Sequence, residues 1–423
     1  MKKRVAAIAF MLATSASFAH ADDNTYDPRA LAMGGTGVTT SNTRNAAFQN
    51  PSMLASTPRD SFAWEIPIIT VRLQDQNKLR SAIDQLKADG SSLTAALQTF
   101  NATPNAPTAN AAANALNNFY NSLTPVGNKT LMADLFVGTM LGIPNKKFAF
   151  SLYVDERAEV GARFNYAAAD QTTLSQLATD LRNCASSNNP TSPSCTAVKT
   201  ANSNGQITNL QSRLLVRGVT IKELGITVAH HFEGMGGMEI GITPKTMQLA
   251  TYDYTLKAQQ TNNITLDQGK KSYNAFNMDV GATKSFKAGS VDEIKAGMVV
   301  KNMLSKSFTT ILGDSINIKP QVAIGVSYLT KLTTTGIDLD VIPNQPVIDG
   351  FSKESQYLRL GAEFDAWRWA QIRIGYRHDL KGNYPGLPSV GLGLSPFGIH
   401  IDLSAARAGD KEAAVSLQAG FNF

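Results

Sequence analysis

The sequence predicts an all-β protein, a transmembrane antiparallel β-barrel of about 14 strands in a bacterial outer membrane. Three observations predict it. The N-terminus resembles an export signal, apolar residues fall mostly on alternate positions from Phe148 onward, and the segments between these runs are alternately short and long. Strands with one apolar and one polar face, joined by short periplasmic turns and long outer loops, are typical of outer-membrane barrels.

The first 21 residues have the organisation of a secretory signal peptide. A cationic start at residues 2–4 is followed by an apolar run at residues 5–12 and by Ala19-His20-Ala21, which matches an A-x-A cleavage site. The alternative is a membrane anchor, but the apolar run is far shorter than the ~20 residues that a spanning helix needs. We therefore expect export, cleavage after Ala21, and a mature chain that starts at residue 22.

The charge of the mature chain gives no reason to expect nucleic-acid binding. The full chain carries a formal net charge of +6, and loss of the three cationic signal residues leaves +3. Binding to nucleic acid usually depends on a strong basic excess. We expect no direct contact with DNA or RNA.

Period-two alternation defines the strands. Apolar residues share one parity, and the opposite parity carries mutually compensating charges that include Arg359, Glu363, Arg373 and Arg377. A soluble sandwich would show the same period, but many of these segments run to ten or more residues, which is longer than usual sandwich strands. We therefore assign the apolar face to lipid and the four charges to the lumen.

Fourteen strands follow from this pattern, and an even number returns the chain to the side on which it started. They are expected at 61–73, 129–143, 147–166, 217–232, 238–256, 273–286, 293–308, 317–330, 335–342, 356–367, 369–380, 389–395, 398–407 and 412–423.

Two long loops, 74–128 and 167–216, contain helical patterns of their own. In the first, apolar residues recur at helical spacing from Leu79 to Phe100, with a break near Gly90, and again from Leu116 to Leu123. In the second, a short pattern surrounds Leu177. The two loops form either a cap over the barrel mouth or mobile surface segments, and the sequence does not choose between them.

The only two cysteines, Cys184 and Cys195, lie in the second long loop. In an exported protein a lone pair in a polar loop is expected to form a disulfide. A zinc site would need further cysteine or histidine ligands nearby, and there are none.

Enzymatic functions find little support. His230 and His231 are adjacent on an expected strand and point to opposite faces. His400 and Asp402 share the lumenal face but lack an identifiable third partner. The common nucleophile, zinc-protease and phosphate-binding motifs are missing. We expect no catalytic residues, no metal and no cofactor.

The segment before the first strand resembles FadL-like outer-membrane proteins. It combines the glycine-rich run Arg29-Ala-Leu-Ala-Met-Gly-Gly-Thr-Gly37 with Asn45-Ala-Ala-Phe-Gln-Asn-Pro51. The resemblance implies that residues 22–60 form a hatch that plugs a barrel of residues 61–423. The motif residues would be Gly34, Gly35, Gly37, Asn50 and Pro51. Ser52 departs from the family's Asn-Pro-Ala pattern.

More of the chain is similar to one branch of that superfamily, the conjugal-transfer TraF-like outer-membrane proteins. The segments that carry this resemblance are Gly241-Ile-Thr-Pro-Lys245, Tyr252-Asp-Tyr254, Tyr357–Glu363, Ile372–His378 and Gly391–Gly398. The chain contains no C-x-x-C motif, so it does not resemble the thioredoxin-like protein that shares the TraF name. The ending Phe421-Asn-Phe423 resembles the terminal signal that the barrel-assembly machinery reads.

Two functions follow as expectations. The TraF-like resemblance implies a non-enzymatic envelope component of conjugal DNA transfer, in contact with outer-membrane lipid, the barrel-assembly machinery and other envelope or conjugation components. The FadL-like resemblance implies a channel for small hydrophobic molecules. A channel would need an apolar pocket behind the hatch, whereas the expected lumenal faces are mostly polar or charged.

Overall fold

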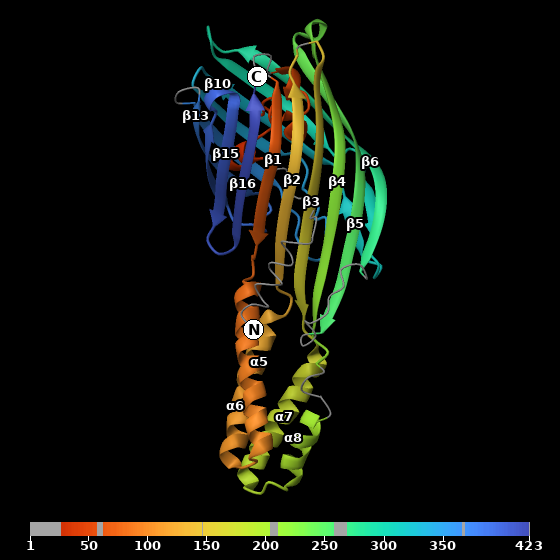
Figure 1. The fold of residues 1–423 in the computed structure, drawn as a ribbon, viewed down its shortest axis with the longest axis vertical. Helices are drawn as coiled ribbons and strands as arrows, with labels where there is room; N and C mark the ends of the chain where they lie inside the picture. The colour runs from red at the N-terminus through yellow and green to blue at the C-terminus, as the bar shows by residue number, and fades with distance from the viewer. Residues whose placement is uncertain are drawn as a thin grey trace.

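Fourteen antiparallel strands close into a barrel in the computed structural model, as the sequence predicted (Figure 1). The structure describes residues 27–56, 62–145, 147–203, 210–257, 269–365 and 369–422. The expected signal peptide and Phe423 lie outside these residues. The last strand pairs with the first, which closes the barrel. The strands of the barrel are β1 Ala63–Gln74, β2 Thr130–Ile143, β3 Ala149–Asn165, β4 Arg213–Phe232, β5 Met238–Lys257, β6 Lys270–Lys287, β7 Glu293–Lys301, β10 Gln321–Leu329, β11 Thr333–Asp340, β12 Tyr357–Asp365, β13 Ala370–Asp379, β14 Leu387–Leu394, β15 Ile399–Ala408 and β16 Glu412–Asn422.

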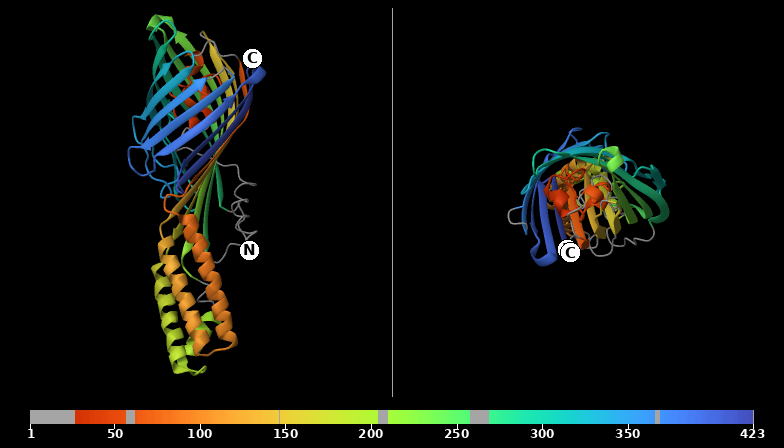
Figure 2. Two further views of the ribbon diagram at one scale, coloured as in Figure 1. Left: turned by 90° about the vertical axis from the view of Figure 1, so that its left-hand side faces the viewer. Right: turned by 90° about the horizontal axis from the view of Figure 1, so that it is seen from above.

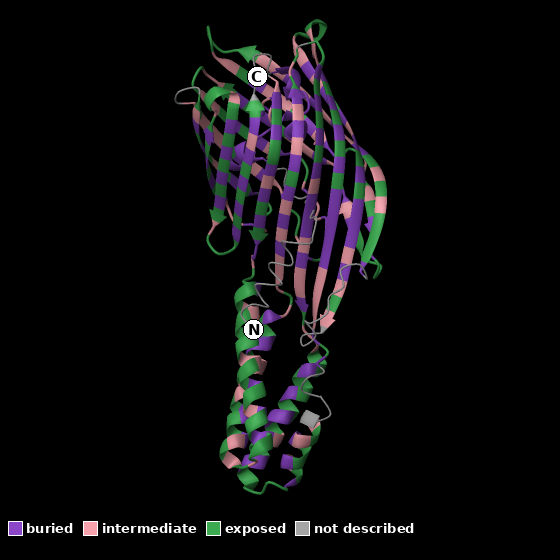
Figure 3. Cartoon of the chain, viewed as in Figure 1, coloured by how far each residue is buried: buried purple, intermediate pink, exposed green. Residues whose placement is uncertain are grey.

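Buried and exposed residues alternate along the barrel strands (Figure 3). The exposed residues of the outward face are mostly apolar, and exposed aromatic residues gather at the end with the short turns. Trp64, Phe148, Trp369 and Phe397 all lie at that end and are exposed. An aromatic girdle at the membrane interface is usual in outer-membrane barrels. The short-turn end therefore lies at one surface of the membrane.

The barrel wall is taller on one side. Strands β2 to β6 have 14 to 20 residues, whereas β10 to β16 have 8 to 11. A strand needs about 9–11 residues to cross a bilayer. On the outward face of the tall side, Lys222 Nζ lies 3.3 Å from Glu156 Oε2, which is an ion pair suited to water. The tall side thus continues past the apolar band toward the long loops.

The two long loops fold into helices that we call the stalk. It comprises α5 Leu79–Ala102, α6 Ala106–Leu123, η1 Thr124–Val126, α7 Ala168–Ser187 and α8 Pro193–Ser203. The helices pack on one another around their own apolar core, and they project along the long axis of the molecule instead of lying across the barrel mouth (Figures 1 and 2). Among the described residues, no helix is both long and apolar enough to cross a bilayer.

The structure differs from the sequence-based expectations in three places. Helix α5 runs through Gly90 without a break, because the ring of Phe119 packs so closely there that a Cβ atom would lie 3.3 Å from Cε2. Helix α8 was not expected. The strand predicted at 293–308 ends at Lys301, and the chain then leaves the wall to form a separate hairpin.

That hairpin and a second loop close over the lumen from the long-loop side, and together we call them the lid. The lid consists of β8 Lys306–Thr309, β9 Ser315–Ile318 and residues 341–356. Its apolar side chains, such as Ile316, Ile348 and Phe351, pack against lumenal residues of the tall wall such as Val219 and Leu249. The guanidinium carbons of Arg163 and Arg217 lie 5.3 and 5.2 Å from the ring centroid of Phe351.

Cys184 and Cys195 form a disulfide that joins α7 to the start of α8. Both residues are buried in the core of the stalk, away from the barrel.

We expect the pair to resist thiol reagents until it is reduced. Cys184→Ser should destabilise the stalk by about 3 kcal/mol and should leave the barrel nearly unchanged, since the bridge closes only a short loop within the stalk. Limited proteolysis of the stalk and heat-modifiable gel migration of the barrel would measure the two effects. A barrel that melts earlier in the variant would contradict this prediction.

Candidate functional site

The N-terminal segment 27–56, which we call the hatch, lies inside the barrel. It contains three short helices, α2 Pro28–Ala32, α3 Ala46–Gln49 and α4 Met53–Ser56. Viewed from above, this segment occupies the space within the ring of strands (Figure 2). Nearly all its side chains are buried. The carboxylate of Asp27 holds the hatch together, since it accepts hydrogen bonds from Ala30 N, Asn45 Nδ2 and Gln49 Nε2 at 2.8, 3.0 and 2.9 Å.

Asn50 and Pro51 lie against the wall formed by β5 to β7. The Asn50 amide donates to the carbonyl oxygen of Val38 at 2.7 Å and lies 3.3 Å from Thr283 Oγ1 on β6. The hydroxyl of Ser52 lies 2.6 Å from the same Thr283 hydroxyl. Ser52, which departs from the family motif, thus adds a hydrogen bond to the wall that an alanine could not make.

The glycines of the motif let the hatch backbone turn and approach the opposite wall. Gly34 and Gly35 have positive φ values of 70° and 89°, a conformation that other residues rarely adopt. The amide of Gly34 donates to Ser389 Oγ at 3.1 Å. The amides of Gly37 and Val38 both donate to one carboxylate oxygen of Asp338, at 2.7 and 2.9 Å.

Glycines of the wall make room for the hatch. A Cβ atom at Gly375 would lie 2.0 Å from the Gly34 nitrogen, and one at Gly241 would lie 2.3 Å from the Pro51 carbonyl carbon. Real Cβ atoms do not approach this closely, so the hatch backbone fits only where the wall has no side chain. Other wall glycines at which a Cβ would lie within 3.1 Å of a hatch atom are Gly142, Gly281, Gly297, Gly325, Gly336, Gly361 and Gly391.

Two of the four predicted lumenal charges belong to one network with the hatch. Arg29 of the hatch donates to both carboxylate oxygens of Glu363, each at 2.9 Å. Arg373 bridges Glu363 and Asp402, at 2.6 and 2.5 Å. Arg44 of the hatch reaches the same Asp402 at 3.4 Å. The arginines of the hatch thus balance this cluster. Without them, the wall residues of the cluster would carry more acidic than basic side chains.

The other two predicted charges pair within the barrel. Arg377 lies 2.6 Å from Glu412, which also pairs with Arg72 at 2.8 Å. Arg359 donates to both oxygens of Asp340, at 2.6 and 3.1 Å. The four charges therefore belong to three sets of ion pairs, two of which meet at the ring of Tyr357, where Arg359 and Arg377 both pack.

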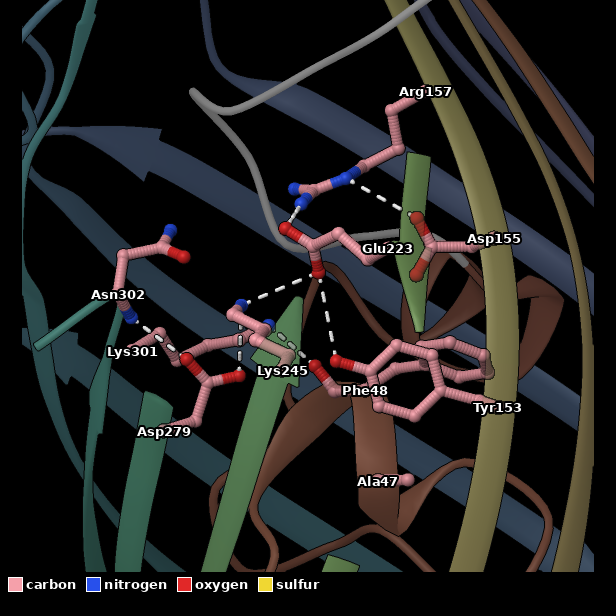
Figure 4. Close-up of a pocket in the computed structure, with 10 residues that line it drawn as sticks. All are labelled: Ala47, Phe48, Tyr153, Asp155, Arg157, Glu223, Lys245, Asp279, Lys301 and Asn302. Atoms are coloured by element: carbon pink, nitrogen blue, oxygen red, sulfur yellow. Dashed lines mark hydrogen bonds and ion pairs between the residues drawn. The ribbon is translucent and has the colours of Figure 1, made fainter. Parts of the chain in front are cut away.

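A polar cavity of about 10 Å³ remains between the hatch and the tall wall (Figure 4). Three acids and three bases surround it, and Phe48 of the hatch packs on Tyr153 at one side, with ring centroids 4.9 Å apart. Lys301 donates to the Phe48 carbonyl oxygen. A space of this size holds about one water molecule. The lining residues with charge are Asp155, Arg157, Glu223, Lys245, Asp279 and Lys301.

The histidines that the sequence singled out each have a different partner in the described part of the chain. His400 Nε2 lies 2.5 Å from Glu65, whereas its neighbour Asp402 pairs with Arg373. His230 packs on Phe232, and His231 lies 3.0 Å from Glu239. Among the residues that the structure describes, no group of three or more potential ligands could hold a metal ion. Phe421, of the expected C-terminal signal, lies on β16 with its ring 6.2 Å from that of Trp64.

Sequence reasoning missed the wall residues that receive the hatch. Thr283, Asp338 and Ser389 bond it directly, and the wall glycines leave it space. The polar members of this set lie on the lumenal face of their strands, and the alternation in the sequence predicts that face. The sequence does not predict which of the many lumenal residues contact the hatch, because these contacts join segments far apart in the chain.

The sequence matches the model of one protein family. A model of the family described as "F plasmid transfer operon, TraF, protein" matches residues 47–340, from the hatch to the end of β11. A search of the curated proteins returns no match.

Solved structures with a similar fold include two that are described as toluene transporters. The toluene transporter TbuX of Ralstonia pickettii matches with a TM-score of 0.52 and 9% identity, over 96% of this chain and 99% of that one. The toluene transporter TodX of P. putida matches at 0.50 and 9%, over 96% and 99%. A FadL homologue of Pseudomonas aeruginosa has a TM-score of 0.49 and 9% identity, over 96% and 100%. At such identities the first two matches show a shared FadL-like barrel fold and nothing further.

Proposed function

The chain belongs to the family described as F plasmid transfer operon TraF protein, and we propose that it serves conjugal DNA transfer as a non-enzymatic component of the outer membrane. It would work through partners in the envelope and without direct contact with DNA. The proposed location follows from the outer-membrane barrel fold and the expected signal peptide. Export would end with insertion by the barrel-assembly machinery.

The observation that carries this proposal is the filled lumen. The hatch is bonded to strands on both sides of the barrel, through Thr283 on β6 and through Asp338 and Glu363 on β11 and β12. The lid covers the other end, and its apolar side chains pack on lumenal residues of the tall wall. A barrel packed in this way supports a scaffold role better than that of an open passage, because solute flow would require many buried bonds to break together.

Deletion of Tyr26 to Leu54 tests the proposal. We expect the barrel to assemble, because all fourteen strands remain, and we expect mating efficiency to fall. Permeability to small solutes should change little, since the lid and the wall ion pairs stay in place. Mating frequency and uptake of a small dye, measured in the same cells, give the two readouts.

A deletion that changes neither mating nor uptake would contradict both a conjugation role and a transport role. The control repeats the deletion together with Arg373→Ala and Arg377→Ala. These substitutions remove lumenal charges that could block the lumen in the absence of the hatch. If the combined variant becomes permeable while mating stays normal, the scaffold proposal fails.

The second candidate is a passage for small hydrophobic molecules. The apolar residues beneath the lid favour it, including Met132, Val219 and Leu249, because they would line an apolar space if the lid moved. The polar surroundings of the hatch argue against it, since an apolar solute would have to pass the cluster of Glu363, Arg373 and Asp402. Growth on a hydrophobic carbon source, with and without the gene, separates the two candidates.

A further inference from the structure

The stalk carries an uncharged surface. Residues 90–128 include the second half of α5 and all of α6, and they contain no Asp, Glu, Lys, Arg or His. At the chain's average of 17% charged residues, a stretch of this length would carry about seven. Exposed protein surfaces usually carry more charge than the average, because charge keeps them soluble. A need for solubility would favour charged residues here, so the lack of charge in residues 90–128 requires another explanation.

Asparagines occupy the exposed face of α6. Asn110, Asn114, Asn118 and Asn121 are all exposed. Their spacing of four, four and three residues places them on one side of the helix, over about 16 Å at ~1.5 Å per residue. The opposite side is buried in the core of the stalk through Ala109, Ala112, Ala113 and Leu116. The helix is thus held by its alanine face and presents a row of amides.

These amides are not used within the protein. In the part of the chain that the structure describes, none of the four side chains is hydrogen-bonded to another protein group. On the neighbouring α5, by contrast, the hydroxyls of Ser92, Thr94 and Thr99 donate to carbonyl oxygens of their own helix at 3.0, 2.9 and 3.0 Å. Asparagine is also a poorer helix former than alanine. The row therefore serves neither the stability of α6 nor its packing.

The chemistry of the row fits a neutral polysaccharide. Each primary amide offers two donors and one acceptor oxygen, and a sugar hydroxyl both donates and accepts. A protein partner would be expected to find aromatic or arginine anchors at the centre of its contact, and the row has none. A charged ligand would find no countercharge on residues 90–128.

The position of the stalk points to the same ligand. The stalk projects from the long-loop end of the barrel, opposite the aromatic girdle of Trp64, Phe148 and Trp369. Long loops face the outside in barrels of this kind, where the sugar chains of lipopolysaccharide stand above the outer leaflet. We propose that the α6 amide row binds the uncharged outer part of the polysaccharide of lipopolysaccharide. This rests on the outer-membrane location proposed above.

Binding to released polysaccharide tests the proposal. The full-length mature protein in detergent is titrated with lipid-free polysaccharide from host lipopolysaccharide, with intact lipopolysaccharide and with lipid A alone. We expect the first two to bind through the stalk. The variant N110A/N114A/N118A/N121A should bind the released polysaccharide at least about tenfold more weakly, because four hydrogen-bonding groups are lost. Alanine favours the helix, so the variant keeps α6 folded.

The matched control is S92A/T94A/T99A, which removes polar groups from the same uncharged stretch that already bond within α5. It should bind as the wild type does. Equal binding of the released polysaccharide by the asparagine variant, an equal loss of lipid A binding in that variant, or a photo-crosslinker at position 114 that captures a protein in place of polysaccharide would each overturn the proposal. Mating frequency is a separate readout, so a failed conjugation role would leave this binding result interpretable.

Discussion

Gly375→Val is expected to expel the hatch from the barrel. A Cβ atom there would lie 2.0 Å from the Gly34 nitrogen and 2.2 Å from the Met33 carbonyl carbon. Overpacking usually costs about 1–3 kcal/mol, because side chains can shift. Here backbone atoms must move, so we expect a cost at or above about 3 kcal/mol and a displaced hatch. Residues 27–56 should become accessible to protease, which a timed digestion of the detergent-solubilised protein would detect.

Gly241→Val should act in the same way on the other side of the lumen, where a Cβ atom would lie 2.3 Å from the Pro51 carbonyl carbon. The control is Gly234→Val in the turn between β4 and β5, where no atom lies within 4 Å of the new Cβ. It should leave hatch protection unchanged. Continued protection of residues 27–56 in both wall variants would show that the hatch tolerates side chains beneath it.

Arg373→Met is expected to destabilise the barrel strongly. Its side chain is fully buried and bridges Glu363 and Asp402, at 2.6 and 2.5 Å. Removal of one partner from a buried ion pair commonly costs about 3–5 kcal/mol, because the remaining charge stays desolvated. Arg29 and Arg44 of the hatch also pair with these two acids and offset part of the loss. Urea-induced loss of the compact gel form would measure the change.

The matched control for this variant is Arg407→Met. Arg407 lies 3.7 Å from Asp410, and both side chains are more than 70% exposed. Exposed pairs contribute about 0–1 kcal/mol, so this variant should unfold at nearly the wild-type urea concentration. If the two arginine variants lose equal stability, the buried cluster is not the source of the effect. A double variant with Arg29→Met should lose more than Arg373→Met alone, because Glu363 then has neither arginine.

Local pattern alone determined much of this protein. Period-two alternation predicted fourteen barrel strands, and helical spacing in the two long loops predicted the helices around Leu79–Phe100 and Leu116–Leu123. These features are readable because burial of one face repeats every two residues in a strand and every three to four in a helix. The sorting of charges onto one parity likewise predicted that Arg359, Glu363, Arg373 and Arg377 face the lumen.

Only the tertiary structure decided how the interior is filled. Arg29 meets Glu363 across 334 positions of sequence, and Gly37 meets Asp338 across 301. Helix α5 continues through Gly90 because Phe119 of another helix covers that glycine. Strand β8 has the same alternation as its predecessors but leaves the barrel, because Phe308 finds an apolar surface beneath the lid. A periodic pattern tells which face of a segment is buried, but the partner that buries it is chosen by contacts between distant segments.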